Sequence, residues 1–284
     1  MNVSLLNRFQ GCLYGSILAP KTEDSEGVIV SHTSVLLEMI EILGHSNSIS
    51  PQKWQNLSQT NPREFPVALI PVALFRHDYL TSFQDELAIL SENQLISPDD
   101  ALALLGWGQV LSLIVREKFP SKNKNKVEVC LSSLQAFTQG TVWEESLIGI
   151  KRAIQEGYSL ETVVETLGAS ELLSAIALSL YFFLDTPEYF DLTLKRAALI
   201  KHPLVLPFTG ALAGAYHGFT GIPLAWRLTQ PEPMFLEPIH QFWGQWSGVL
   251  SENALPFSTA IASPLVIQNR PNLQLISQGD YFQT

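Results

Sequence analysis

Apolar residues recur at intervals of three and four along most of the chain, which is the spacing of an amphipathic helix. Residues 35–44, VLLEMIEILG, show this pattern clearly. One face of the segment carries the side chains of Leu36, Met39, Ile40 and Leu43. Glu38 and Glu41 fall on the opposite face, and a glycine such as Gly44 is a common helix end. The pattern predicts a helix that stops at Gly44.

Start and stop signals divide other apolar stretches into helices. Residues 97–119 begin with Ser97, a residue type that caps helix N-termini with its side-chain oxygen. Residues 159–200 hold three predicted helices, and Ser159 and Gly168 bound the first of them. Alternating strand patterns are scarce. We therefore expect an all-α fold, a compact multi-helix domain around one core.

The composition changes at residue 229, where prolines and aromatic residues become frequent. We expect a helical domain over residues 1–228 and an irregular C-terminal extension over residues 229–284. The extension is expected to pack on the domain or on a partner. Aromatic side chains are enriched at protein interfaces, so four of them are candidates for partner binding. They are Phe235, Phe242, Trp243 and Trp246.

One uncharged stretch is long enough to raise the question of a membrane span. Residues 203–226 carry no formal charge over 24 positions. The stretch also holds three prolines, several glycines and His217. We interpret it as a buried helix at the centre of a large helical domain, because such a helix is hydrophobic all round. The N-terminus shows no export signal, and the expected location is the cytoplasm.

The overall balance of residues favours a large buried interior and excludes one class of partner. Hydrophobic residues make up 46% of the 284 residues, and charged residues make up 15%. The net charge is −10, which argues against sequence-independent binding to nucleic acid, because such binding needs a basic surface. The two cysteines, Cys12 and Cys130, match no metal-binding or redox spacing.

Two motifs resemble a known family. GALAGAYHGFTGIPLAW, residues 210–226, is similar to the last conserved helix of the ADP-ribosylglycohydrolases. RFQGCLYGSILA, residues 8–19, resembles the first helix of that family, and residues 175–197 resemble the helix pair before its last motif. The resemblance implies an all-α fold. In active members it also implies a cleft with two magnesium ions, held by two aspartate-rich motifs, that position ADP-ribose and the attacking water.

This chain departs from the family at both of these acidic motifs. Matching residues 40–43 to the family pattern puts the first motif on residues 30–33, VSHT. Counting back from Gly210 puts the second on residues 199–204, LIKHPL. None of these positions carries a carboxylate, and one carries Lys201. Because magnesium is bound mostly by carboxylate oxygens, we expect no metal and no other cofactor.

The residues left at these positions are the candidates for lining what remains of the cleft. They are Ser31, His32 and Thr33 in the first motif, Lys201 and His202 in the second, and Asn61 in the segment that the resemblance assigns to the substrate cleft. The two histidines could hold a different metal or could be ordinary polar residues. Lys201 could offer its charge to a phosphate or could point into water. The recurring glycines at 210, 214 and 218 are expected to serve close helix packing.

The function expected from this resemblance is that of a catalytically inactive relative acting as a binding, scaffolding or regulatory protein. Its partner would be another protein or an anionic small molecule. Two alternatives remain open. One is an active hydrolase with a reworked, metal-independent cleft. The other is a nucleotide or anion sensor, which binds its ligand without cleaving it.

Overall fold

The computed structural model describes residues 3–18, 26–46, 48–119, 126–135, 140–168, 172–228 and 232–248, with the backbone alone at 26–31, 126, 135 and 232–236. Its helices are α1 (Leu5–Ile17), α2 (Glu26–His45), α3 (Pro51–Thr60), α4 (Leu69–Phe75), α5 (Leu80–Glu92), α6 (Pro98–Val115), α7 (Lys126–Gln135), α8 (Val142–Glu156), α9 (Leu160–Leu167), α10 (Leu172–Asp185), α11 (Phe190–Ala198), α12 (Val205–His217), α13 (Leu224–Arg227) and α14 (Glu232–Ser247). Two short 3₁₀ turns are η1 (Phe65–Ala68) and η2 (Phe219–Gly221). No strand occurs among the described residues, so the all-α prediction is confirmed.

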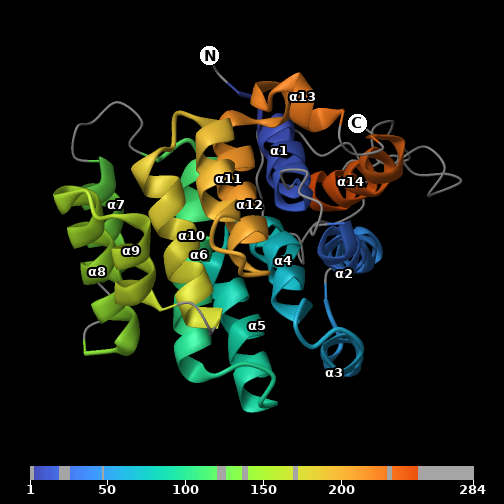
Figure 1. Ribbon diagram of the computed structural model, residues 1–284. Helices are drawn as coiled ribbons and strands as arrows, with labels where there is room; N and C mark the ends of the chain where they lie inside the picture. Colours follow the sequence, from blue (N-terminus) through green and yellow to red (C-terminus); the bar gives the residue numbers. More distant parts are fainter. Residues whose placement is uncertain are drawn as a thin grey trace, which may run out of the picture.

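Helices α6, α10 and α12 lie in the middle of the molecule (Figure 1). Helices α7, α8 and α9 lie to one side of them, and α2, α3 and α14 lie to the other. The predicted helix starts are confirmed at Ser97 and Ser159, whose side-chain oxygens accept from the backbone N–H of Asp100 and Thr162. The helix predicted to stop at Gly44 runs one residue further, to His45. Gly44 therefore lies inside α2 and does not end it, because the last turn of the helix still packs against α14.

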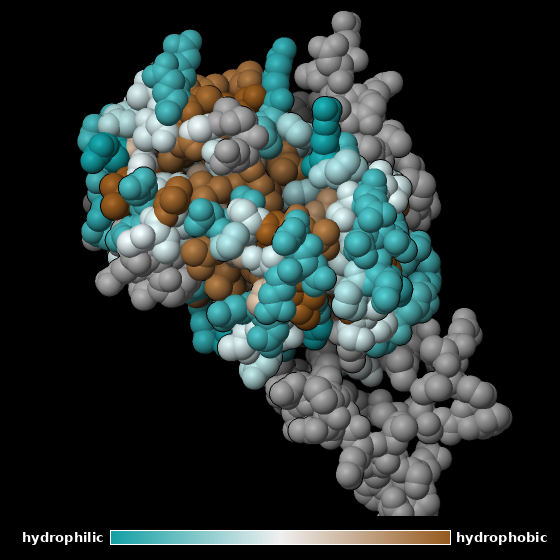
Figure 2. Space-filling model, turned by 90° about the horizontal axis from the view of Figure 1, so that it is seen from below, coloured by the Kyte–Doolittle hydropathy of each residue, from teal (hydrophilic) through white to brown (hydrophobic). Residues whose placement is uncertain are grey.

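The uncharged stretch 203–226 divides into α12, η2 and α13. Helix α12 has 13 residues and packs against α1, α6, α10 and α11, which makes it a buried central helix as expected. Within the described parts of the chain, no helix combines the length and the apolar character needed to cross a membrane. Hydrophobic residues do reach the surface, however. Figure 2 shows a broad group of them on the face seen from below, bordered by hydrophilic residues.

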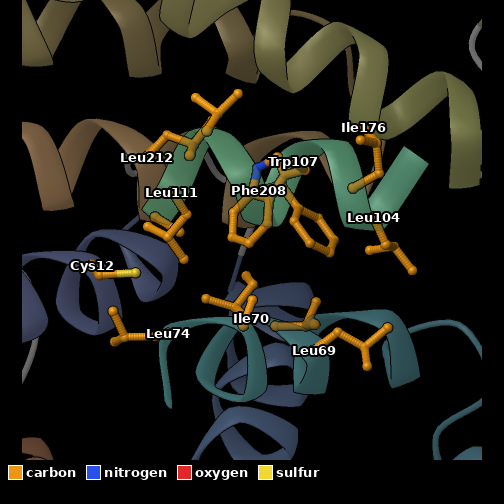
Figure 3. Close-up of a cluster of buried hydrophobic side chains, with 14 of the residues drawn as sticks. Cys12, Leu69, Ile70, Leu74, Leu104, Trp107, Leu111, Ile176, Phe208 and Leu212 are labelled. Atoms are coloured by element: carbon orange, nitrogen blue, oxygen red, sulfur yellow. The ribbon is translucent and has the colours of Figure 1, made fainter. Parts of the chain in front are cut away.

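The centre of the core is built from α1, α4, α6, α10 and α12 (Figure 3). Trp107 of α6 and Phe208 of α12 meet edge to face there, with ring centroids 5.0 Å apart. Both cysteines are buried and unpaired. Burial raises the pKa of the Cys12 thiol, and it raises the pKa of Cys130 to about 12. These thiols are therefore un-ionised packing groups at neutral pH.

Helices α1 and α12 approach each other through glycines. A Cβ at Gly15 would overlap the carbonyl oxygen of Gly210, and a Cβ at Gly214 would overlap that of Gly11. The order of these pairs shows that the two helices run antiparallel. The prediction of close packing is thus confirmed for Gly210 and Gly214. The prediction holds for Gly218 as well, since a Cβ at Gly11 would lie 2.7 Å from its carbonyl carbon. Gly218 also ends α12 at φ +69°, in the left-handed region that favours glycine.

The extension predicted to be irregular contains a regular helix. Residues 232–247 form α14, which packs against α1 and α2. Ile239, Phe242 and Trp246 are buried and recur at helical spacing, so the apolar face of α14 completes the same core. Pro238 stands inside the helix and removes one backbone donor, but the tertiary packing outweighs that loss. Residues 249–284 lie outside the described part, and the division of the chain at residue 228 stays a prediction.

Candidate functional site

Residues 30–33, the first stretch compared with the family's acidic motifs, lie within α2, which packs against η1, α4 and α14. His32 and Thr33 are buried, with 6% and 7% of their surface exposed. Their neighbours along the helix, Val35 and Leu36, are buried as well. Ser31 lies on the same helix, but its side chain is outside the described part. The motif is therefore a packed stretch of helix at His32 and Thr33.

His32 has an unusual environment for a buried polar side chain. Its Nε2 atom makes no hydrogen bond. Burial lowers the pKa of His32, because a charged imidazolium is disfavoured away from water. The carboxylate of Glu64 acts in the opposite direction, through its negative charge, and raises that pKa. The net lowering keeps the imidazole neutral at pH 7, with a nitrogen that has no partner.

The turn between α3 and η1 brings Glu64 to this position. Asn61 ends α3, where its N–H donates to the carbonyl of Leu57 at 3.0 Å. Its own carbonyl accepts from the N–H of Phe65 at 2.8 Å, which closes the turn that includes Glu64. Asn61 is partly exposed, and both of these hydrogen bonds are made by its backbone. Two segments that the sequence analysis singled out, around His32 and around Asn61, are thus adjacent in the fold.

Residues 199–204, the second of these stretches, form the connection between α11 and α12. Lys201 is exposed and has φ +51°, a left-handed conformation that reverses the chain after α11. His202 is half-buried, and its Nδ1 atom accepts from the N–H of Leu204 at 3.2 Å. The carbonyl of His202 accepts from the N–H of Val205 at 3.3 Å. Burial lowers the pKa of His202, so the ring is a neutral acceptor.

These contacts use part of the hydrogen-bonding capacity at the start of α12. The helix begins at Val205, and Pro203 lies in the turn before it. His202 already accepts from two N–H groups here, which leaves fewer donors for an anion than a bare helix start would offer. Within the described part, no hydrogen bond or ion pair joins Lys201 or His202 to His32.

The aromatic residues of α14 that were candidates for partner binding are mostly internal. Phe242 is fully buried and Trp246 is 4% exposed. The ring of Phe9 lies 4.9 Å from that of Trp246 and 5.0 Å from that of Trp243, which is half-buried. The prediction of a partner surface is therefore corrected for Phe242 and Trp246, because contacts with α1 cover them. The side chain of Phe235, in α14, is outside the described part.

One buried charge was missed by the sequence analysis. Glu86 of α5 is only 8% exposed. Its Oε2 atom accepts from Trp54 Nε1 at 3.4 Å, and its Oε1 atom lies 3.6 Å from a guanidinium nitrogen of Arg76. Burial raises the pKa of Glu86 despite the opposing effect of Arg76. The sequence signal was present, since Glu86 falls on the apolar face of α5 between Phe83 and Leu90.

One recess in the described part of the chain involves none of the candidate residues. A pocket of about 760 Å³ lies between the ends of α6, α8, α9 and α10. Its rim includes Asp99, Glu145 and Glu165, which are exposed carboxylates. Asp100, also on the rim, accepts from the N–H groups of Ser97 and Leu173 and so caps the starts of two helices. The pocket is an open acidic recess whose best-defined polar group has a structural role.

The described residues contain no group of three or more His, Cys, Asp or Glu side chains that could hold a metal ion. Residues 19–25, which include Glu23 and Asp24, lie outside the described part, so the expectation of a metal-free protein stays a prediction. No model of a known protein family matches the chain. A search among curated proteins finds no match either.

Proposed function

We propose that this chain is a catalytically inactive relative of the ADP-ribosylglycohydrolases that acts as a binding, scaffolding or regulatory protein. The resemblance rests on residues 8–19 and 210–226. These stretches fall on α1 and on α12 to α13, and α1 crosses α12 with glycine against glycine. The contact supports the proposal because the glycines that give the two motifs their likeness to the family are the ones that the helix crossing requires.

The side chain at position 32 carries the proposal. The resemblance implies a metal-binding aspartate there, and this chain has a buried imidazole whose pKa is lowered by burial. Magnesium prefers oxygen ligands and gives up its water reluctantly. A single neutral nitrogen in an apolar setting is a poor substitute for two carboxylates. At the other motif, Lys201 would add a positive charge that repels a dication.

An activity assay tests this proposal directly. The full chain is incubated with an arginine-ADP-ribosylated protein and magnesium, and free ADP-ribose is measured with and without a chelator. An active family member serves as the positive control. We expect no release above the level of the chelator-treated sample. Clear turnover that the chelator abolishes would show that the chain is an enzyme and would refute the proposal.

One observation favours a second candidate function, an anion or nucleotide sensor. The side chain of Lys201 is exposed in the turn ahead of α12, where it is accessible to a phosphate. The test is calorimetric titration with ADP-ribose in chelator, on the wild type and on Lys201→Ala. Binding that the substitution weakens about tenfold or more supports a sensor. Binding that is absent, or equal in both proteins, removes Lys201 from any ligand site.

A further inference from the structure

Helix α11 and the residues that flank it present a row of exposed apolar side chains. Tyr189, Leu192 and Leu199 are 65%, 45% and 66% exposed. An interval of seven residues places Leu192 and Leu199 on one side of the helix, and Tyr189 is the residue just before its first turn. The opposite side of α11 packs against α10 and α12 and carries the buried Phe190 and Leu194. We call the row of Tyr189, Leu192 and Leu199 the α11 stripe.

A second helix adds to this apolar surface. In α13 and the residue after it, Leu224 and Leu228 are 58% and 71% exposed. Trp226 lies between them in the sequence and donates from its Nε1 atom to Asp191 of α11 at 2.7 Å. Its ring also meets that of Phe190, with centroids 6.0 Å apart. Exposed apolar residues on two adjoining helices exceed the single ones that are scattered over any protein surface.

The charges along α11 indicate what could cover the stripe. Acidic residues stand at its beginning, at Glu188 and Asp191, and basic residues stand in its last turn, at Lys195 and Arg196. Asp191 and Lys195 form an ion pair at 2.8 Å within the helix, with side chains 46% and 61% exposed, and Arg196 pairs with Asp185 of α10. These pairs lie at or near the surface, so their charges still act on a neighbouring molecule. In a two-fold symmetric pair, each contact between two positions occurs twice. If the two α11 helices run antiparallel, the acidic beginning of each lies against the basic end of the other.

We propose that the α11 stripe is a self-association surface, on which the α11 stripe of a second copy of this chain docks antiparallel. The apolar side chains supply the contact, and the charge gradient selects the antiparallel orientation. Stable interfaces cover about 800 Å² on each partner, and one short helix with a few leucines beside it offers less. The dimer is therefore weak and forms in a concentration-dependent way. This inference does not depend on the proposed relation to the ADP-ribosylglycohydrolases.

Sedimentation of the full chain between about 1 and 200 µM tests the surface. We expect the average mass to rise from the 31.5 kDa of one chain towards twice that value. Leu192→Glu should abolish the rise. Ile148→Glu, on the exposed side of α8, is the matched control, because Ile148 is 43% exposed and Leu192 is 45% exposed. A mass of one chain at every concentration, or an equal effect of both variants, would overturn the proposal.

A charge exchange tests the antiparallel orientation. Glu188→Lys and Lys195→Glu should each weaken self-association by about tenfold, because each places like charges opposite one another. An equimolar mixture of the two variants should associate like the wild type, since both contacts of the mixed pair then join unlike charges. A mixture as weak as its components excludes this pairing. Association that is lost when the chain is cut after Gly248 but is unaffected by Leu192→Glu would assign it to residues 249–284 instead.

Discussion

Gly15 of α1 and Gly210 of α12 face each other at a crossing so close that neither position has room for a side chain. Gly11 and Gly214 repeat the same relationship further along the two helices. The residues are about 200 positions apart in the sequence, so this contact ties the beginning of the chain to its last third. It also brings the two motifs that carry the family resemblance together in the core.

Gly214→Ala is expected to destabilise the protein by about 3 kcal/mol, near the upper end of what overpacking usually costs, because the new Cβ meets a backbone oxygen that cannot move aside. Gly44→Ala is the control. It lies inside α2, and its Cβ would be 3.7 Å from its nearest neighbour, an ordinary contact. Alanine there should be neutral or stabilise by up to about 1 kcal/mol, since it favours a helix. Urea unfolding of both variants measures the difference, and equal stabilities would contradict the account of the crossing.

As the pH rises, the free energy of unfolding of the wild type should fall relative to that of Glu86→Gln. Its pKa is raised in the folded protein, so the folded state holds its proton more tightly than the unfolded state does. The stability from this group is therefore complete below the ordinary carboxyl range and is lost as the pH rises through the folded pKa. Unfolding both proteins in urea from pH 4 to pH 8 measures the trend. The opposite slope would mean that attraction to Arg76 outweighs burial.

His32 is expected to show the reverse behaviour. Its pKa is lowered in the folded state, so the unfolded state binds a proton more readily, and the stability from this group is lost as the pH falls below the ordinary histidine range. Glu64→Gln removes the charge that raises this pKa, and should lower the pKa further. Nuclear magnetic resonance of the imidazole across a pH titration measures the pKa of His32 in the wild type and in Glu64→Gln. An unchanged pKa in Glu64→Gln would show that the two side chains are not coupled.

Removal of α14 should expose part of the core. A chain cut after Leu228 loses the buried rings of Phe242 and Trp246, each worth about 1.5–3 kcal/mol of burial. A chain cut after Gly248 keeps α14 and is the control. We expect the shorter chain to unfold at lower urea or to aggregate, relative to the control. If the two truncated chains are equally stable and soluble, α14 is dispensable to the core.

Helix starts and the fold class could be predicted because their signals are local. Ser97 and Asp100 recognise each other across one helical turn, so the capping motif is visible in four consecutive residues. The helical spacing of apolar residues is equally local, and it predicted the all-α class. The packing role of Gly210 and Gly214 could also be inferred, because their spacing of four places both on one helix face.

The sequence by itself determined these local features and the lack of carboxylates at residues 30–33 and 199–204, whereas the tertiary structure alone decided which distant groups meet. Prolines made residues 229–246 look irregular, yet the apolar face of α14 gains enough from packing on α1 and α2 to hold a helix through Pro238. His32 lies beside Glu64 because a turn at Asn61 directs the chain past α2. No sequence pattern within one helix predicts this contact. The energy of the contact comes from burial and from the interaction of charges on separate elements, and the arrangement of those elements depends on the whole core.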